Sequence, residues 1–96
     1  INNLPMIKHI NIKVFGRVQG VGFRYFVKQQ ANKLGLKGFV QNQQDGAVYV
    51  EIEGEKELVY KLVKWCKKGS PWSKISQVDV RQGEIREFAD FSVQPD

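Results

Sequence analysis

Residues 14–27 read Val-Phe-Gly-Arg-Val-Gln-Gly-Val-Gly-Phe-Arg-Tyr-Phe-Val, and this stretch decides how the rest of the chain is interpreted. Just before its glycines, apolar and polar residues alternate from Ile10 to Val14, which is the period of a half-buried strand. After them, apolar residues recur at helical spacing from Phe23 to Leu34, and Gly35 follows as a stop signal. The stretch therefore predicts a strand, a glycine-rich loop and a helix.

The same two periodicities predict the other elements. These are strands over residues 36–42, 48–53 and 76–82, a helix over 55–67, and a short last strand at 91–93. The turn between the second and third strands contains Asp45-Gly46, a pair typical of β-hairpins. In the fourth strand we expect Val78 and Val80 to point inward.

The element order is β-α-β-β-α-β, the split βαβ arrangement of ferredoxin-like folds. We therefore expect an α+β domain over residues 6–96, with an antiparallel sheet of four to five strands and two helices on one face. Residues 1–5, Ile-Asn-Asn-Leu-Pro, are interpreted as an N-terminal arm or an expression remnant. This architecture serves enzymes and RNA binders alike, so it does not decide the function.

Composition limits the class of protein. A chain of 96 residues, 42% of them hydrophobic and 26% charged, fits one globular domain. No apolar run approaches the roughly 20 residues of a membrane helix, and no secretory leader opens the chain. A single cysteine excludes a disulfide within the chain. We expect a cytoplasmic protein that does not associate with membranes.

Positive charge is concentrated in the first part of the chain. Residues 1–44 carry a net charge of +7, whereas residues 45–96 carry −2. An unopposed positive half indicates an anionic ligand, although a solvated basic face explains the charge equally well.

Several kinds of catalytic site are not expected. The glycines do not have the spacing of a Walker A loop, and Tyr25 stands where a dinucleotide fingerprint needs a third small residue. Cys66 lies on the apolar stripe of a helix, which favours a structural thiol. His9 lies on the outward face of the first strand without an evident partner, so we expect neither catalysis nor a metal site from it.

The glycine-rich loop is the candidate anion site. Its glycines allow backbone N–H groups to turn inward at the start of a helix, where they bind phosphate well. The guanidinium of Arg24, in the first helical turn, can hold two oxygens of the same anion. The backbone N–H groups of this cradle belong to Arg17, Val18, Gln19, Gly20, Val21, Gly22 and Phe23. The alternative is a tight turn followed by a surface arginine.

Asn42 is the second candidate. It ends the second strand in the same alternation as Val40, and we expect it on the core side of the sheet near the glycine-rich loop. An amide there can accept a hydrogen bond from water and donate one to an anion. The alternative is an ordinary turn-forming asparagine.

Two segments carry a resemblance to a known family. Gly16-Arg-Val-Gln-Gly-Val-Gly-Phe-Arg24 resembles the first signature of the acylphosphatases, and Gly38-Phe-Val-Gln-Asn42 followed by Gly46-Ala-Val48 resembles the second. The element order also matches that family from about Lys8 to Val93. The resemblance implies a monomeric cytoplasmic hydrolase of small acyl phosphates that needs no metal or cofactor, with phosphate or sulfate as product-like ligands.

The resemblance also implies roles for individual residues. Arg24 corresponds to the phosphate-binding arginine, the loop amides to the phosphate cradle, and Asn42 to the residue that orients the attacking water. The leaving carboxylate departs without an acid, and the first 44 residues offer no acidic base. We therefore expect a phosphate oxygen of the substrate to accept the proton, and sugar phosphates to be poor substrates.

Two non-enzymatic alternatives remain open at this point. Lys37-Gly38-Phe39-Val40 begins like the RNP1 element of an RNA-recognition domain, but it lies on the second strand, and the third offers only Tyr49 as an exposed aromatic residue. The other alternative is a sensor that binds phosphate or acyl phosphate without catalysis.

Overall fold

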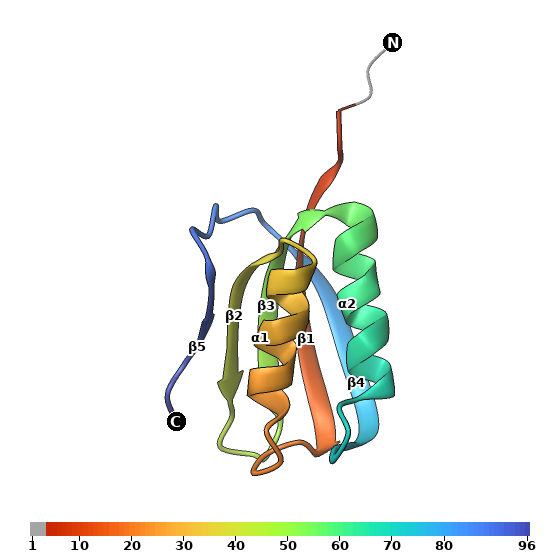
Figure 1. Cartoon of the computed structure of the whole chain (residues 1–96), viewed down its shortest axis with the longest axis vertical. Helices are drawn as coiled ribbons and strands as arrows, with labels where there is room; N and C mark the ends of the chain where they lie inside the picture. The colour runs from red at the N-terminus through yellow and green to blue at the C-terminus, as the bar shows by residue number, and fades with distance from the viewer. Residues whose placement is uncertain (1–3) are drawn as a thin grey trace.

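The computed structural model describes residues 4–96, and the elements follow the predicted order (Figure 1). In chain order they are β1 (Ile7–Arg17), α1 (Phe23–Lys33), β2 (Lys37–Asn42), β3 (Val48–Glu55), α2 (Lys56–Lys68), β4 (Lys74–Gly83) and β5 (Phe91–Val93). The predicted ferredoxin-like α+β fold class is confirmed. Residues 1–3 lie outside the described residues, so the separation of residues 1–5 as an arm stays a prediction.

Within the described residues the strands form one sheet in the order β4-β1-β3-β2-β5. The β1–β3, β1–β4 and β2–β3 pairs are antiparallel, as predicted, whereas β5 pairs with β2 in parallel. This departure from an antiparallel sheet arises because the chain leaves β4 at one edge and passes over to the opposite edge before it enters β5 (Figure 1).

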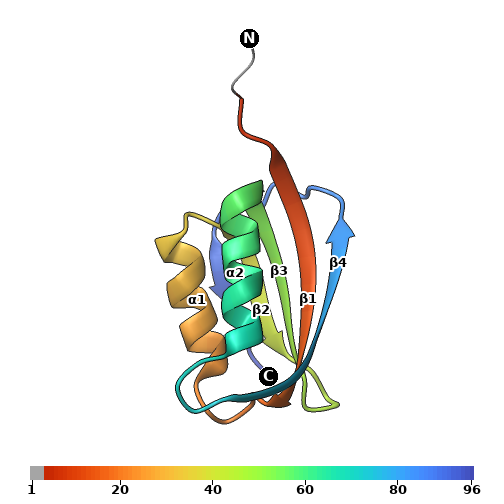
Figure 2. The ribbon, with the colours of Figure 1, turned by 90° about the vertical axis from the view of Figure 1, so that its right-hand side faces the viewer.

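Both helices cover the same face of the sheet (Figure 2). The core between the two layers combines inward residues of β1 and β3 with one stripe of each helix, among them Ile12, Val14, Val50, Ile52, Phe23, Val27, Val59, Leu62 and Cys66. Each large apolar side chain buried there contributes roughly 1.5–3 kcal/mol to the stability of the fold. No helix in the described range is long and apolar enough to cross a membrane.

On β4, Val80 lies on the core side of the sheet, as predicted, but it is only partly covered. Val80 is 39% exposed, although its partner across the sheet, Ile12, is fully buried. Because β4 is an edge strand with a neighbour on one side only, its side chains are covered less than those of β1 and β3.

Candidate active site

The glycine-rich loop is anchored by its valines and bent by its glycines. Val18 is buried in the core and Val21 packs against it, while Gly20 and Gly22, on either side of Val21, have φ angles of 75° and 78°. Only glycine adopts such left-handed angles readily, so the loop curls back on itself directly before α1. Gly22 is also the N-cap residue of α1, which has no side-chain cap.

This curl leaves main-chain donors unmatched. Within the described part of the chain, no N–H group of residues 18–22 donates to a backbone carbonyl outside the regular elements. Unpaired N–H groups at a helix N-terminus carry partial positive charge and favour an anion. The side chain of Gln19 donates to the carbonyls of Gln43 at 2.7 Å and Ala47 at 2.9 Å, so it ties the loop to the β2–β3 turn.

Arg24 and Asn42 meet at one oxygen atom. The guanidinium Nη1 of Arg24 lies 2.8 Å from Oδ1 of Asp96, and it also donates to the Gln94 carbonyl at 3.0 Å. The amide Nδ2 of Asn42 donates to the same Asp96 Oδ1 at 2.9 Å. The end of β2 and the first turn of α1 therefore present two donors to a single anionic oxygen.

The other end of the Asn42 amide has no partner. Its Oδ1 is buried and accepts no hydrogen bond from the described residues. A buried carbonyl oxygen without a donor is uncommon in folded proteins and calls for an explanation. Here the unmatched acceptor belongs to a side chain that lines a cavity.

That cavity, which we call the anion pocket, has a volume of about 620 Å³. It is bordered by Val18, Gly20, Gly22 and Phe23 from the loop, Arg24, Tyr25, Lys28, Gln29 and Asn32 from α1, Asn42 from β2, and Val93, Gln94 and Pro95 from the C-terminal segment. Arg24 and Asn42 thus share one cavity with part of the predicted cradle. Arg17, Gln19 and Val21 do not line it, and the side chain of Arg17 is exposed.

No pattern in the sequence indicates that the C-terminal segment, residues 93–96, lies near the site. The first 44 residues contain no acidic side chain, and the carboxylate near the loop comes from the other end of the chain: Asp96 contacts both Arg24 and Asn42. The reason is the parallel pairing of β5 with β2, which carries the following residues toward the Asn42 end of β2. The alternation of apolar and polar residues indicates a short last strand at 91–93, but it does not indicate which edge of the sheet this strand joins.

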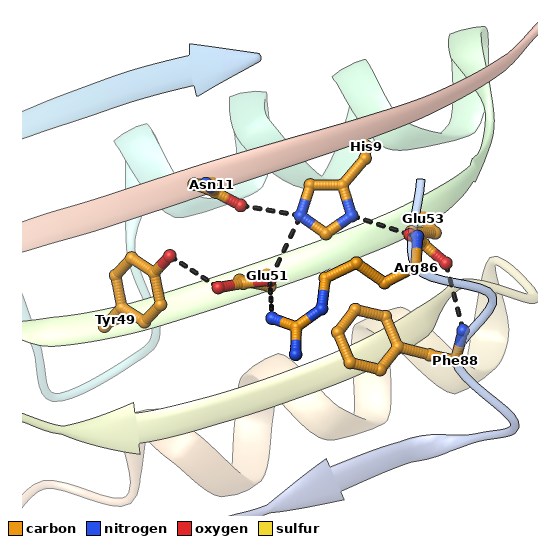
Figure 3. A network of polar contacts seen from close by, with 7 residues as sticks. All are labelled: His9, Asn11, Tyr49, Glu51, Glu53, Arg86 and Phe88. Atoms are coloured by element: carbon orange, nitrogen blue, oxygen red, sulfur yellow. Dashed lines mark hydrogen bonds and ion pairs between the residues drawn. The ribbon is translucent and has the colours of Figure 1, made fainter. Parts of the chain in front are cut away.

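His9 is also different from the expectation of a surface residue without partners. It points away from the helices but is only 2% exposed (Figure 3). Its Nδ1 lies 2.7 Å from Oε2 of Glu53, and its Nε2 lies 2.7 Å from Oδ1 of Asn11 and 3.1 Å from Oε1 of Glu51. The antiparallel register places His9 opposite Glu53, which a reading of β1 alone cannot reveal.

The chain after β4 covers this face. Backbone N–H groups of Arg86 and Phe88 donate to the Glu53 carboxylate, and the Phe88 ring stacks on His9 with centroids 5.9 Å apart (Figure 3). Burial raises the pKa of Glu53, but these hydrogen bonds and the His9 ring outweigh it, so the pKa lies below its ordinary value. We call this set the open-face network; its members are His9, Asn11, Tyr49, Glu51, Glu53, Arg86 and Phe88.

The covered face does not favour an RNA-recognition domain. Tyr49, expected to be exposed, is half-buried and donates to Glu51 at 2.6 Å. Burial and the Glu51 carboxylate raise the pKa of Tyr49 to about 12. The ring of Phe39 packs against Tyr49 and Phe88 instead of offering a free platform for bases.

The described residues contain neither an exposed cysteine nor a cluster of side chains that could hold a metal ion. Cys66 is fully buried, and burial raises the pKa of its thiol to about 12, which agrees with the structural role expected from the sequence. Across residues 4–96, no three histidine, cysteine or acidic side chains are grouped as metal ligands.

Comparison with known proteins identifies the family of the chain. A family model described as acylphosphatase matches residues 10–93. The chain belongs to the acylphosphatase family. It is 42% identical to an acylphosphatase of Ligilactobacillus salivarius over 88 residues, which cover 91% of this chain and 98% of that protein.

Solved acylphosphatase structures share the fold. The crystal structure of the Bacillus subtilis acylphosphatase superposes with a TM-score of 0.88 at 40% identity and covers 94% of this chain and all of that one. A Coxiella burnetii acylphosphatase gives the same TM-score at 33% identity, covering 92% and 93% of the two chains. The activity of the chain is therefore that of an acylphosphatase, a hydrolase that acts on small acyl phosphates.

Proposed function

We propose that the anion pocket hydrolyses the carboxyl–phosphate bond by in-line attack of a water molecule on phosphorus. In this mechanism Arg24 and the backbone N–H groups of residues 17–23 hold the phosphate oxygens, and Asn42 orients the water. The products are a carboxylate and inorganic phosphate, and neither a metal nor a cofactor takes part.

The observation that carries this proposal is the shared contact at Asp96. The Oδ1 atom of this carboxylate lies 2.8 Å from Arg24 Nη1 and 2.9 Å from Asn42 Nδ2. A carboxylate oxygen has the charge and hydrogen-bonding capacity of a phosphate oxygen, so it marks a position where the two side chains can hold an anion. The unmatched N–H groups of the adjoining loop supply further donors for the remaining oxygens.

Asn42 supports the role in orienting water through its second amide atom. With Nδ2 donating to an anionic oxygen, Oδ1 is left buried and without a donor. A water molecule that donates to Oδ1 would be held beside the anion, with its lone pair free to attack. The amide then fixes both nucleophile and target, and such positioning lowers the activation barrier by several kcal/mol, about 7–11 in the best cases.

The remaining chemistry needs little from the protein. The leaving carboxylate has a conjugate acid with a pKa near 4, so it departs as an anion without a proton donor. Charge on the transferred group is stabilised by Arg24 and the amides, an electrostatic effect worth roughly 2.7–4 kcal/mol per donor. A phosphate oxygen of the substrate accepts the proton of the water. Asp96 is not the base in this scheme, because it occupies the anion position and must leave when substrate binds.

Inorganic phosphate and sulfate follow from this scheme as product-like ligands that replace Asp96 at Arg24. We further propose that the chain acts as a monomer in the cytoplasm, since the anion pocket is built from one chain. The net positive charge of residues 1–44, which include the loop and α1, would attract the anionic substrate.

The test is hydrolysis of acetyl phosphate in ¹⁸O-labelled water with a metal chelator present. Attack on phosphorus puts the label into inorganic phosphate and leaves the acetate unlabelled. Glucose 6-phosphate, measured beside it, should be hydrolysed far more slowly because its alkoxide leaving group needs a proton donor. Label in the acetate, or loss of activity with the chelator, would contradict the proposal.

A further inference from the structure

The anion pocket is larger than a phosphate group requires. Its volume of about 620 Å³ lies within the range of roughly 300–1,000 Å³ found for sites that hold whole small molecules. The cavity continues beyond the loop along α1, where Arg24, Lys28 and Asn32 each contribute to the wall. These residues are four positions apart, so they lie on one helix face at intervals of about 6 Å.

All charged side chains in the wall of this cavity are positive. Arg24 and Lys28 are the charged side chains among the residues that line the cavity, and both are positive. The facing wall consists of neutral residues of the C-terminal segment, Val93, Gln94 and Pro95. Among the described residues that line the cavity, none carries a negative charge that could pair with Lys28.

Lys28 combines a place in the cavity wall with an ammonium group that no side chain of the described residues pairs with. Lys13 pairs with Asp45 at 2.8 Å, Arg24 with Asp96, and Arg86 with Glu51. Within residues 4–96, the ammonium group of Lys28 makes neither an ion pair nor a hydrogen bond, although its side chain is partly buried in the pocket wall. An ammonium held in a concave, neutral wall is a good binding group for a carboxylate or phosphate.

We infer that Lys28 is a specificity-determining residue that binds a second anionic group on the acyl part of the substrate. This inference rests on the proposed function, which places the phosphate at Arg24 and the loop. The acyl part then runs along α1, and an anionic group about one helical turn away meets Lys28. The preferred substrates are acyl phosphates of short dicarboxylic acids or of similar acids with a second negative charge.

The experiment compares two acyl phosphates, glutaryl phosphate and its distal methyl ester, which replaces the second negative charge with a neutral group that is one methyl larger. The readout is the ratio of their kcat/KM values. The wild-type chain should prefer glutaryl phosphate about tenfold, the value of one charge-assisted hydrogen bond. Lys28→Gln should bring the ratio close to one, mainly through KM for glutaryl phosphate, and Lys28→Arg should preserve the preference.

Lys33→Gln is the matched control, because Lys33 is on the same helix and has the same charge but lies outside the pocket. Lys33→Gln should leave the ratio of the two kcat/KM values unchanged. If the preference came only from the net charge of the chain, Lys33→Gln and Lys28→Gln would lower the ratio equally. Raising the salt concentration should reduce the preference of the wild type.

Three outcomes would overturn the inference. The first is a wild-type ratio of kcat/KM values near one, and the second is a preference for the methyl ester, which would indicate an apolar acyl site. The third is that Lys28→Gln lowers kcat/KM equally for both substrates. Failure of the proposed function is a separate result. In that case acetyl phosphate itself would fail to react, or Arg24→Ala would hydrolyse it at the wild-type rate.

Discussion

The molecule contains two polar clusters of similar composition, the anion pocket and the open-face network. Each brings cationic and carboxylate side chains together from several strands or helices. In the open-face network, His9 is buried and both of its ring nitrogens face acceptors, while Glu53 accepts from His9 and two backbone N–H groups. In the anion pocket, Asn42 Oδ1 accepts no hydrogen bond from residues 4–96, no N–H group of residues 18–22 donates there to a backbone carbonyl outside the regular elements, and Asp96 is 69% exposed.

This difference separates a structural cluster from a binding one. Polar groups that satisfy one another gain stability for the fold, and a ligand has nothing left to contact. Polar groups that line a cavity and lack some of their hydrogen-bond partners cost the fold some stability, but a substrate can bind to them. From the sequence we expect no catalytic role for His9 and a role in the site for Asn42. In the structure both ring nitrogens of His9 face acceptors, whereas Asn42 Oδ1 accepts no hydrogen bond from residues 4–96.

The largest expected effect is that of Arg24→Ala. Removing the guanidinium should lower kcat/KM for acetyl phosphate by about a thousandfold or more and abolish binding of inorganic phosphate at millimolar concentration. Steady-state kinetics and isothermal titration calorimetry measure the two effects. The partly exposed Arg24–Asp96 pair contributes little to stability, so the free energy of unfolding should change by less than about 1 kcal/mol. A large loss of stability with activity retained would place Arg24 in the structural cluster instead.

Asn42→Ala should affect kcat and ligand binding unequally. We expect kcat for acetyl phosphate to fall about a hundredfold, because the water is no longer oriented, while the affinity for phosphate changes only severalfold. Asn42→Asp is a useful companion, since it keeps the acceptor but adds a charge that repels the phosphate. A near-normal kcat in Asn42→Ala would show that its assigned role is wrong.

Glu53→Gln should show the opposite behaviour, with stability lost and catalysis kept. Removing the buried carboxylate beside His9 should lower the free energy of unfolding by about 2–3 kcal/mol at pH 7, while kcat of the folded protein stays within twofold. Urea denaturation measures the first quantity.

The pH dependence of that loss follows from the pKa of Glu53. Because its pKa in the folded state lies below the ordinary value of 4.5, the ionised carboxylate stabilises the fold above that pH. The contribution disappears as the pH falls through the lower folded-state pKa. The stability difference between wild type and Glu53→Gln should therefore narrow below about pH 4.5. A difference that is constant from pH 7 to pH 3 would contradict this account of the network.

The smallest effect is expected from Asp96→Asn. Removing a competing negative charge from the anion position should lower KM for acetyl phosphate about two- to threefold and leave kcat unchanged, since an exposed ion pair is worth less than about 1 kcal/mol. Asp90→Asn, on an exposed residue outside the pocket, controls for net charge. An increase in KM would mean that Asp96 assists binding instead of competing with it.

Local patterns predicted the fold and part of the site. Alternation and helical spacing gave the strands and helices, and the glycines at 20 and 22 correctly indicated left-handed backbone and a curled loop. The placement of Asn42 beside Arg24 followed from the period-two register of β2 and is consistent with their shared contact at Asp96. Each of these inferences depends on neighbours in sequence.

The parts that sequence reasoning missed depend on partners far away along the chain. The burial of His9 requires both the β1–β3 register and the segment that returns over the sheet after β4. The contact of Asp96 with Arg24 and Asn42 requires β5 to join the β2 edge in parallel. A three-residue strand carries too little pattern to reveal which edge it joins or in which direction it runs.

The most direct test of the central claim is a titration of the ¹⁵N-labelled chain with inorganic phosphate, followed through its backbone amide resonances. The account predicts saturable shifts of the amides of residues 17–23 and of the Arg24 and Asn42 side-chain signals, while those of His9 and Glu53 stay in place. Absence of shifts in the glycine-rich loop at saturating phosphate, or shifts confined to the open-face network, would contradict it.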